Sequence, residues 1–266
     1  MNMLASLKDV FSKKNIIWNL AKADFKKKFA GSYFGIFWMF VQPIVTILIY
    51  YVVFQLGFKS TPPSSINAPY VLWLVPGIVP WFFFSEAVQN GTNSLFEYSY
   101  LVKKVVFKVS ILPTIKVVSS MFVHVIFIGI MVCFFMVMGY MPQLSWIQII
   151  YYSFCTFMLA MGISYLTSAI NVFFKDMAQI VGIILQFGMW VTPIMWHYSM
   201  LEEFLPILKL NPFFYISEGY RQSMLEGEWF WCHPKMTLYF WVFTIVLFLI
   251  GSKVFKKLKP HFADVL

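Results

Sequence analysis

The feature that most constrains this chain is an uncharged run from residue 29 to residue 58, entered directly from a cluster of lysines. Lys26, Lys27 and Lys28 precede the run, and Lys59 is the next charged residue. A run of this length exceeds the roughly 20 residues that an α-helix needs to cross the hydrocarbon core of a bilayer. Because lysine-rich flanks stay in the cytoplasm on insertion, the sequence predicts a membrane span at 32–58 that starts from the cytoplasmic side.

The composition extends this prediction to the whole chain. Hydrophobic residues make up 60% of the 266 residues and charged residues only 12%, and the mean hydropathy is +0.75. Soluble domains carry about 25% charged residues, so the chain is predicted to be an all-α, polytopic membrane protein. The net charge of +9 does not indicate a nucleic-acid partner, because the basic residues lie in short patches between apolar segments.

Six membrane spans are expected from the apolar segments of the chain. They are placed at 32–58, 70–90, 111–138, 145–172, 177–197 and 236–254. This count leaves both termini in the cytoplasm. All but four of the 20 basic residues then fall on the cytoplasmic side, as the positive-inside rule requires. The exceptions are Lys59, Lys209, Arg221 and Lys235.

Residues 10–29 are predicted to form an amphipathic helix that lies on the membrane surface. At 100° per residue, Asn15, Asn19, Lys22 and Lys26 form a polar stripe. Ile17, Leu20 and Ala21 lie opposite, and Asp24 and Lys28 interrupt that apolar face. Such a helix can rest among the lipid headgroups, although a solvated helical tail is an alternative. The expected interfacial lysines are Lys22, Lys26, Lys27 and Lys28.

Two connecting segments stand out. The cytoplasmic segment 92–104 is polar and then basic, which suits contact with a soluble partner, although a solvated connector is the commoner role of such a loop. Its candidate contact residues are Asn93, Ser94, Leu95, Phe96, Glu97, Lys103 and Lys104. The outer segment 198–234 holds apolar pieces too short to cross the bilayer, which is typical of re-entrant or interfacial helices.

Three polar residues within or beside the spans can be explained by ordinary packing or solvation as well as by a functional role. Glu86 is expected at the interface or facing an aqueous lumen, because a carboxylate at mid-bilayer costs about 2.5–3.5 kcal/mol. Lys116 lies near enough to the inner face to snorkel. His124 is better explained as a packed, hydrogen-bonded residue than as a proton relay. The three cysteines have no paired spacing, so no metal site is predicted.

Several short motifs occur in one order along nearly the whole chain. They are Gly31-Ser32-Tyr33-Phe34-Gly35 followed by Trp38 and Pro43, the segment 101–107, Phe174-Lys175-Asp176, Thr192-Pro193-Ile194, and Leu210-Asn211-Pro212 with Tyr220-Arg221. As a set they resemble the membrane subunit of ABC-2 type polysaccharide exporters. Two positions depart from that family's pattern: Lys108 replaces a usual proline, and Lys175 replaces a commoner arginine, which removes a planar fork of donors.

The resemblance implies an ATP-driven exporter of a lipid-linked polysaccharide in the bacterial inner membrane. The cargo class would be O-antigen, capsule or wall teichoic acid. The sequence contains no Gly-Lys dipeptide and therefore no phosphate-binding loop. The resemblance thus implies a separate ATPase subunit, two copies of which would bind ATP and Mg on a homodimer of this chain. The chain itself is expected to be neither an enzyme nor a cofactor binder.

Two other functions remain open at this level. The same fold could export a drug or a small lipid. A multi-pass acyltransferase or glycosyltransferase is disfavoured, because the four histidines are scattered and the sequence contains no Asp-x-Asp or His-Glu-x-x-His motif.

A sugar pathway would need aromatic faces on which pyranose rings stack and slide. The candidates are Trp38, Trp73, Trp81, Phe84, Tyr152, Trp190 and Trp196, although aromatic residues near span ends also form interfacial belts in other membrane proteins. Glu218 and Arg221, spaced i,i+3, are the candidate gate of the outer re-entrant segment, with a structural ion pair as the alternative.

Overall fold

The computed structural model describes residues 13–266 except 31–32, 60–61, 63–65, 67 and 104–107. This part of the chain is helical and contains no β-strand. The long helices are α3 (Trp38–Tyr50, extended by the π-helix η2, Tyr51–Gly57), α4 (Tyr70–Glu97), α6 (Leu112–Val137), α7 (Gln148–Phe173) and α11 (Pro234–Leu258). Each lies in a segment long and apolar enough to cross a membrane. The predicted all-helical, multi-pass class is confirmed.

The fifth predicted span, 177–197, is shorter than expected. Its helix, α8 (Met177–Val191), has 15 residues, fewer than the roughly 20 that cross a bilayer. The helix ends at Thr192 because Pro193 cannot continue the backbone hydrogen-bond ladder. Five helices of spanning length are therefore present in the described chain, and α8 is the exception among the six expected.

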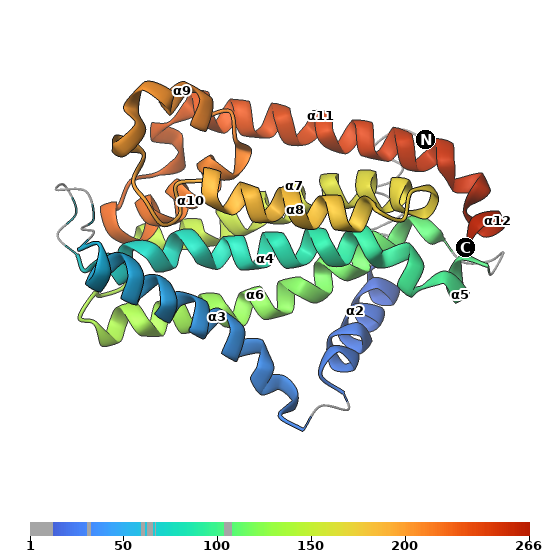
Figure 1. The fold of residues 1–266 in the computed structure, drawn as a ribbon, viewed down its shortest axis with the longest axis horizontal. Helices are drawn as coiled ribbons and strands as arrows, with labels where there is room; N and C mark the ends of the chain where they lie inside the picture. Colours follow the sequence, from blue (N-terminus) through green and yellow to red (C-terminus); the bar gives the residue numbers. More distant parts are fainter. Residues whose placement is uncertain (1–12, 31–32, 60–61, 63–65, 67, 104–107) are drawn as a thin grey trace.

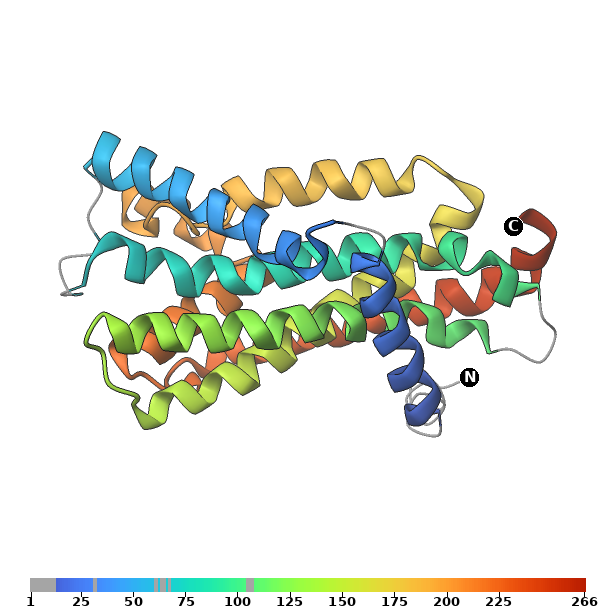
Figure 2. The ribbon, with the colours of Figure 1, turned by 90° about the horizontal axis from the view of Figure 1, so that it is seen from below.

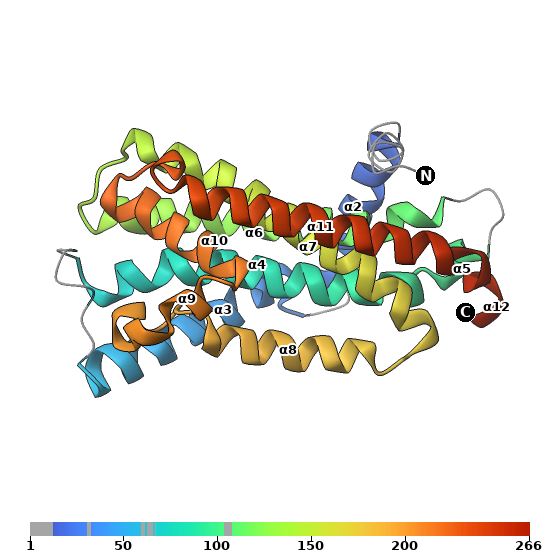
Figure 3. The same ribbon diagram turned by 90° about the horizontal axis from the view of Figure 1, so that it is seen from above.

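Helix α4 lies at the centre of the bundle (Figures 1 and 3). In Figure 3, helices α6, α7 and α11 lie on one side of it, and α3 and α8 lie on the other. The most apolar stretch of α4 is 78% buried, whereas that of α3 is only 6% buried. Helix α4 therefore forms the core, while α3 lies at the edge of the protein.

Helix α4 also runs further than the sequence suggested. A span ending at residue 90 and a separate cytoplasmic segment from residue 92 were expected, yet the helix continues to Glu97. Gly91 lets this part of α4 pack closely on α7, because a Cβ there would lie 2.1 Å from Ser164 Oγ of α7. At the next residue, Thr92 Oγ1 lies 2.7 Å from Thr167 Oγ1 of α7. Small and hydroxyl-bearing residues commonly join helices in this way in membranes.

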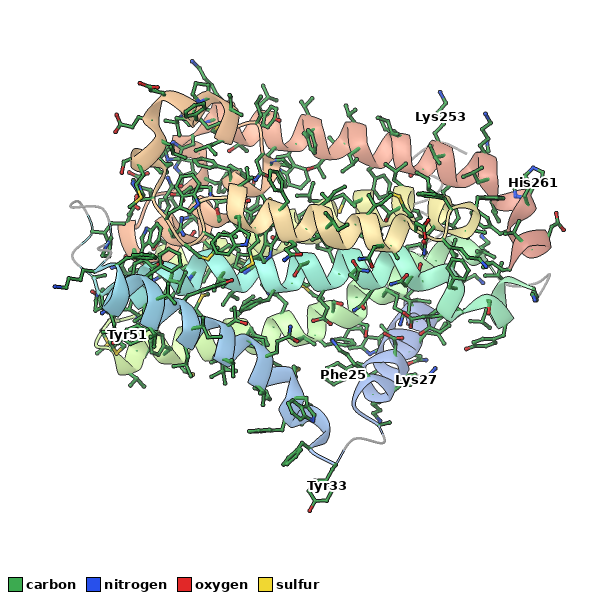
Figure 4. The ribbon with its side chains drawn as sticks, viewed as in Figure 1. Phe25, Lys27, Tyr33, Tyr51, Lys253 and His261 are labelled. Atoms are coloured by element: carbon green, nitrogen blue, oxygen red, sulfur yellow. The ribbon has the colours of Figure 1, made fainter. Side chains whose placement is uncertain are left out.

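The N-terminal helix α2 (Lys14–Phe29) runs across the bundle rather than along it (Figure 2). It buries Ile17 and Ala21, and the rings of Trp18 and Phe25 pack edge-on against Phe122 of α6. Residues 10–12 of the expected helix lie outside the described residues. Figure 4 shows Tyr33 at the tip of the turn between α2 and α3, where its side chain is 98% exposed.

Short helices fill the space between α8 and α11 at one end of the bundle (Figure 1). They are η5 (Tyr198–Phe204), α9 (Leu205–Leu208), α10 (Pro212–Arg221), η6 (Gln222–Glu226) and η7 (Phe230–Cys232). The side chain of Asn211 caps α10 by accepting a hydrogen bond from the Phe213 amide. The opposite end of the bundle carries α5 (Ser99–Val102), η8 (Lys259–His261) and α12 (Phe262–Val265).

Candidate functional site: an ion-pair cluster, a buried arginine and their helices

Lys116 of α6 lies at the centre of a cluster of charged side chains. Its Nζ donates to Asp24 Oδ1 of α2 at 2.6 Å and to Glu97 Oε2 of α4, also at 2.6 Å. Tyr98 completes the cluster, because its hydroxyl donates to Asp24 Oδ1 at 2.8 Å. Burial and the neighbouring Asp24 carboxylate raise the pKa of Tyr98, so the phenol keeps its proton and remains a donor.

The sequence predicted that Lys116 would snorkel toward the inner face, and this was wrong. The residue is only 5% exposed. Snorkelling is unnecessary because two carboxylates meet the ammonium inside the protein, and a buried charge is tolerated when it is paired and hydrogen-bonded. The sequence could not supply the partners, since Asp24 is 92 positions away along the chain.

A second ion pair joins the C-terminal end of α2 to the bundle. Lys28 Nζ lies 2.6 Å from Glu86 Oε1 of α4, and both side chains are partly exposed. Glu86 Oε1 also accepts from Ser120 Oγ at 3.2 Å and from Asn90 Nδ2 at 3.5 Å. Glu86 therefore occupies a polar, partly accessible position at the edge of α4.

The two ion pairs explain an irregularity in the pattern of α2. Asp24 and Lys28 interrupt its apolar face, which otherwise carries Ile17 and Ala21. In the structure this whole face packs on the bundle, and the two interrupting charges are the ones that pair with Lys116 and Glu86. The position of α2 on the bundle is thus set by two ion pairs as well as by the burial of its apolar side chains.

Arg221, the only arginine of the sequence, is fully buried beneath the short helices between α8 and α11. Its Nη1 donates to the carbonyl of Pro193 at 2.7 Å and its Nη2 to that of Ile194 at 2.6 Å. Nη1 also pairs with Glu218 Oε1. The guanidinium lies 3.6 Å from the centroid of the Trp73 ring, and its Nε donates to the Trp73 carbonyl.

These contacts satisfy the irregular backbone that follows α8. Arg221 donates hydrogen bonds to the carbonyls of residues 193 and 194, and the Tyr70 hydroxyl donates to the Met195 carbonyl. Asn211 Nδ2 donates to Thr192 Oγ1 at 2.7 Å. Non-helical backbone at membrane depth persists only when such partners replace water. Arg221 therefore joins α4, the end of α8 and α10 into one unit.

His124 has the packing environment that was expected for it. It is buried against Phe83, with a ring separation of 4.6 Å, and its Nε2 lies 3.0 Å from the Tyr220 hydroxyl and 3.2 Å from Ser153 Oγ. Its Nδ1 has no hydrogen-bond partner in the described protein. Within that same part of the chain, no group of three His, Cys, Asp or Glu side chains could hold a metal ion.

The seven aromatic candidates for a pathway are not gathered in one place. Trp73, Trp81, Phe84 and Tyr152 are buried between helices of the same chain, whereas Trp38 and Trp190 are exposed on α3 and α8. Trp196 is half-buried. Arg221 has no surface open to a ligand in this conformation, and Glu218 is turned to it.

The predicted cytoplasmic contact residues divide into two groups. Ser94 and Leu95 are buried and Asn93 and Phe96 are half-buried in the contact of α4 with its neighbours. Glu97 and Lys103 are exposed, and Lys104 lies outside the described residues. On α2, the lysines at 22, 26, 27 and 28 are all exposed, and Figure 4 shows Lys27 directed away from the bundle.

Long apolar helices joined by buried polar clusters define a multi-pass integral membrane protein. The chain belongs to the ABC-2 type transporter family, which matches residues 16–225. It is therefore the transmembrane permease of an ABC transporter and not the ATPase itself. The resemblance noted in the sequence is confirmed.

Curated relatives extend over nearly the whole chain. Two O-antigen export system permease proteins RfbA from Klebsiella pneumoniae are each 28% identical over 249 residues, covering 93% of both chains. The O-antigen export system permease protein RfbA of Myxococcus xanthus is 25% identical over 267 residues, covering 98% of this chain and 99% of the relative.

Proposed function

We propose that this chain is the membrane subunit of an ATP-driven exporter that moves a lipid-linked, O-antigen-like polysaccharide across the bacterial inner membrane. The observation that carries the proposal is the near-complete coverage by relatives named as O-antigen export permeases. The aromatic content of 21% supports it, since aromatic faces can stack on sugar rings without holding them by charge. Wall teichoic acid remains the alternative cargo.

The energy would come from a separate ATPase subunit that binds ATP and Mg. We place its contact at the exposed end of α4 and α5, from Glu97 to Lys103. Glu97 shares Lys116 with Asp24 of α2, so a movement of the α4 end would move α2 with it. Two ATPase copies are expected if the permease is a homodimer.

A homodimer would form through the side of the molecule that carries α3 and α8 (Figures 2 and 3). Both helices present large apolar side chains outward, including Trp38 on α3 and Phe187 and Trp190 on α8. A sugar pathway between two copies would then run along α4, with Trp38 and Trp190 as the candidate residues that the partner can reach.

The proposed topology has six membrane segments with both termini in the cytoplasm. The fifth segment needs α8 to be completed by residues 192–197, and the short helices after it would form the re-entrant part. The complete set of hydrogen bonds to the carbonyls of residues 193–195 supports a position at membrane depth.

Deletion of the gene from its host tests the function. The expected result is loss of the surface polysaccharide with intracellular accumulation of the lipid-linked chain, reversed by the wild-type permease. Normal surface polysaccharide together with loss of resistance to a small amphiphile would instead identify a drug exporter. The matched control is a strain that lacks only a glycosyltransferase of the same glycan, which should lose the polysaccharide without accumulating it.

A further inference from the structure

Two cavities on the side of α4 that faces α3 and α6 join into one amphipathic groove. The first, of about 360 Å³, has Lys28 and Glu86 at its charged end, with Gln42 and His124 among its other walls. The second, of about 280 Å³, is lined only by apolar residues of α3, α4 and α6. Val79 and Phe127 line both cavities. We call the combined space the α3–α6 groove.

The groove exists because α3 packs loosely on the bundle, with only 6% of its most apolar stretch buried. Phe40 packs against Phe127 with ring centroids 6.0 Å apart, and further along Phe54 stacks on Tyr70 at 6.2 Å. Between these contacts, Ile44 and Leu48 line the groove and yet remain 49% and 55% exposed. An apolar gap of this kind loses its dispersion contacts if it stays empty, so within a bilayer a hydrocarbon chain will fill it.

The charged end of the groove carries one positive and one negative side chain. Lys28 and Glu86 are paired at 2.6 Å, but they are 44% and 26% exposed, and an exposed ion pair contributes little on its own. A headgroup that carries an ammonium and a phosphate can therefore replace the pair without leaving either charge alone. A headgroup with only negative charge would place that charge beside Glu86. Charge complementarity thus favours a zwitterion.

A buried polar atom beside the groove also lacks a partner. His124 lines the first cavity, and its Nδ1 has no hydrogen-bond partner among the described residues. Buried polar atoms in folded proteins are nearly always satisfied, by protein, water or ligand. An oxygen of a lipid backbone, below the headgroup, has the chemistry to complete it.

We propose that the α3–α6 groove binds one zwitterionic aminophospholipid, with its phosphate on Lys28, its ammonium on Glu86 and a hydrocarbon chain between α3 and α6. The lipid then provides the packing that α3 lacks within the chain. The site does not depend on the identity of the exported polymer, although Trp38, a candidate residue of the polymer pathway, lines its first cavity. Under the proposed topology the lipid comes from the cytoplasmic leaflet.

Lipid retention tests the headgroup preference. The full-length chain, with its ATPase partner, is reconstituted into vesicles of equimolar phosphatidylethanolamine and phosphatidylglycerol. The complex is then extracted and washed in detergent, and the lipids that stay bound are measured by native mass spectrometry. Retention of one phosphatidylethanolamine per protomer is expected, with roughly tenfold weaker retention in Glu86→Gln, equivalent to about 1.4 kcal/mol. Lys256→Met, which removes an exposed lysine of α11 remote from the groove, is the matched control and should not change it. Equal retention of both lipids by the wild type would overturn the proposal.

Photo-crosslinking tests the position of the chain and does not require that Glu86→Gln folds. A benzophenone side chain replaces Leu48, which lines the groove, or its neighbour Ile49, which is similarly exposed but does not. A phospholipid adduct at Leu48 in clear excess over Ile49 is expected. Equal adducts at both positions, an adduct with a second copy of the chain, or one with a polyprenyl-linked glycan would each contradict the assignment. Filling the groove by Leu48→Trp should abolish lipid retention with the charges intact.

Discussion

Lys116 of α6 donates a 2.6 Å hydrogen bond to Asp24 of α2, and this bond joins the N-terminal helix to the bundle. The same ammonium binds Glu97 at the end of α4. One buried cation therefore connects three helices on the side where an ATPase is proposed to bind. Movement of any one of them without the others would break a charge-assisted bond in a largely buried place.

Replacing Lys116 by methionine should release α2 from α6. The substitution keeps the length of the side chain but leaves Asp24 without its cation, and losing one partner of a buried pair costs about 3–5 kcal/mol. Exposure of α2 to limited proteolysis, measured on the purified permease, should rise. Lys103→Met removes an exposed lysine and should change stability by no more than about 0.5 kcal/mol. Unchanged protection of α2 in Lys116→Met would contradict the role of the pair.

Arg221→Lys should destabilise the short helices between α8 and α11 even though the charge is kept. Lysine has no planar fork, so it cannot serve the carbonyls of residues 193 and 194 and Glu218 while also stacking on Trp73. Each lost bond to a charged donor costs about 1.5–3 kcal/mol. Thermal unfolding followed by tryptophan fluorescence should show the loss. Lys209→Met, at an exposed site nearby in the sequence, is the control that should leave the transition unchanged.

Gly91→Ala should separate α4 from α7. The added Cβ would lie 2.1 Å from Ser164 Oγ, and overpacking of this kind costs about 1–3 kcal/mol. Ser164→Gly removes the obstructing group, so the double variant should recover most of the stability, which a double-mutant cycle measures. Gly129→Ala is the control, since a Cβ there would meet nothing within 4 Å. A double variant no more stable than Gly91→Ala would disprove the steric explanation.

Cysteine labelling should place the two ends of the bundle on opposite sides of the membrane. Cys133 and Cys232 are exposed and must first be replaced. With Lys209→Cys, a reagent that cannot enter cells should react from outside, whereas Lys253→Cys should react only after permeabilisation. Figure 4 shows Lys253 and His261 at the end of the bundle opposite Tyr51. Reaction of both sites from the same side would refute the proposed topology.

The periodicity and charge of the sequence predicted the helical class and the long apolar segments well. They failed where a residue's role depends on a distant partner. Lys116 is an isolated charge in the sequence, and only packing brings Asp24 and Glu97 to it. Gly91 resembles a helix end until Ser164 is known to lie against it. The outer segment was expected to contain short helices, but the carbonyls that Arg221 satisfies become visible only in three dimensions.

The hydrogen bonds from Arg221 to residues 193 and 194 can form only late in the synthesis of the chain. The backbone that breaks α8 is synthesised 27 and 28 positions before the side chain that satisfies it. Until residue 221 has left the ribosome and entered the membrane, the break has none of these donors. An Arg221→Ala chain, in which the break never gains them, should consequently be degraded faster in cells than the wild-type chain.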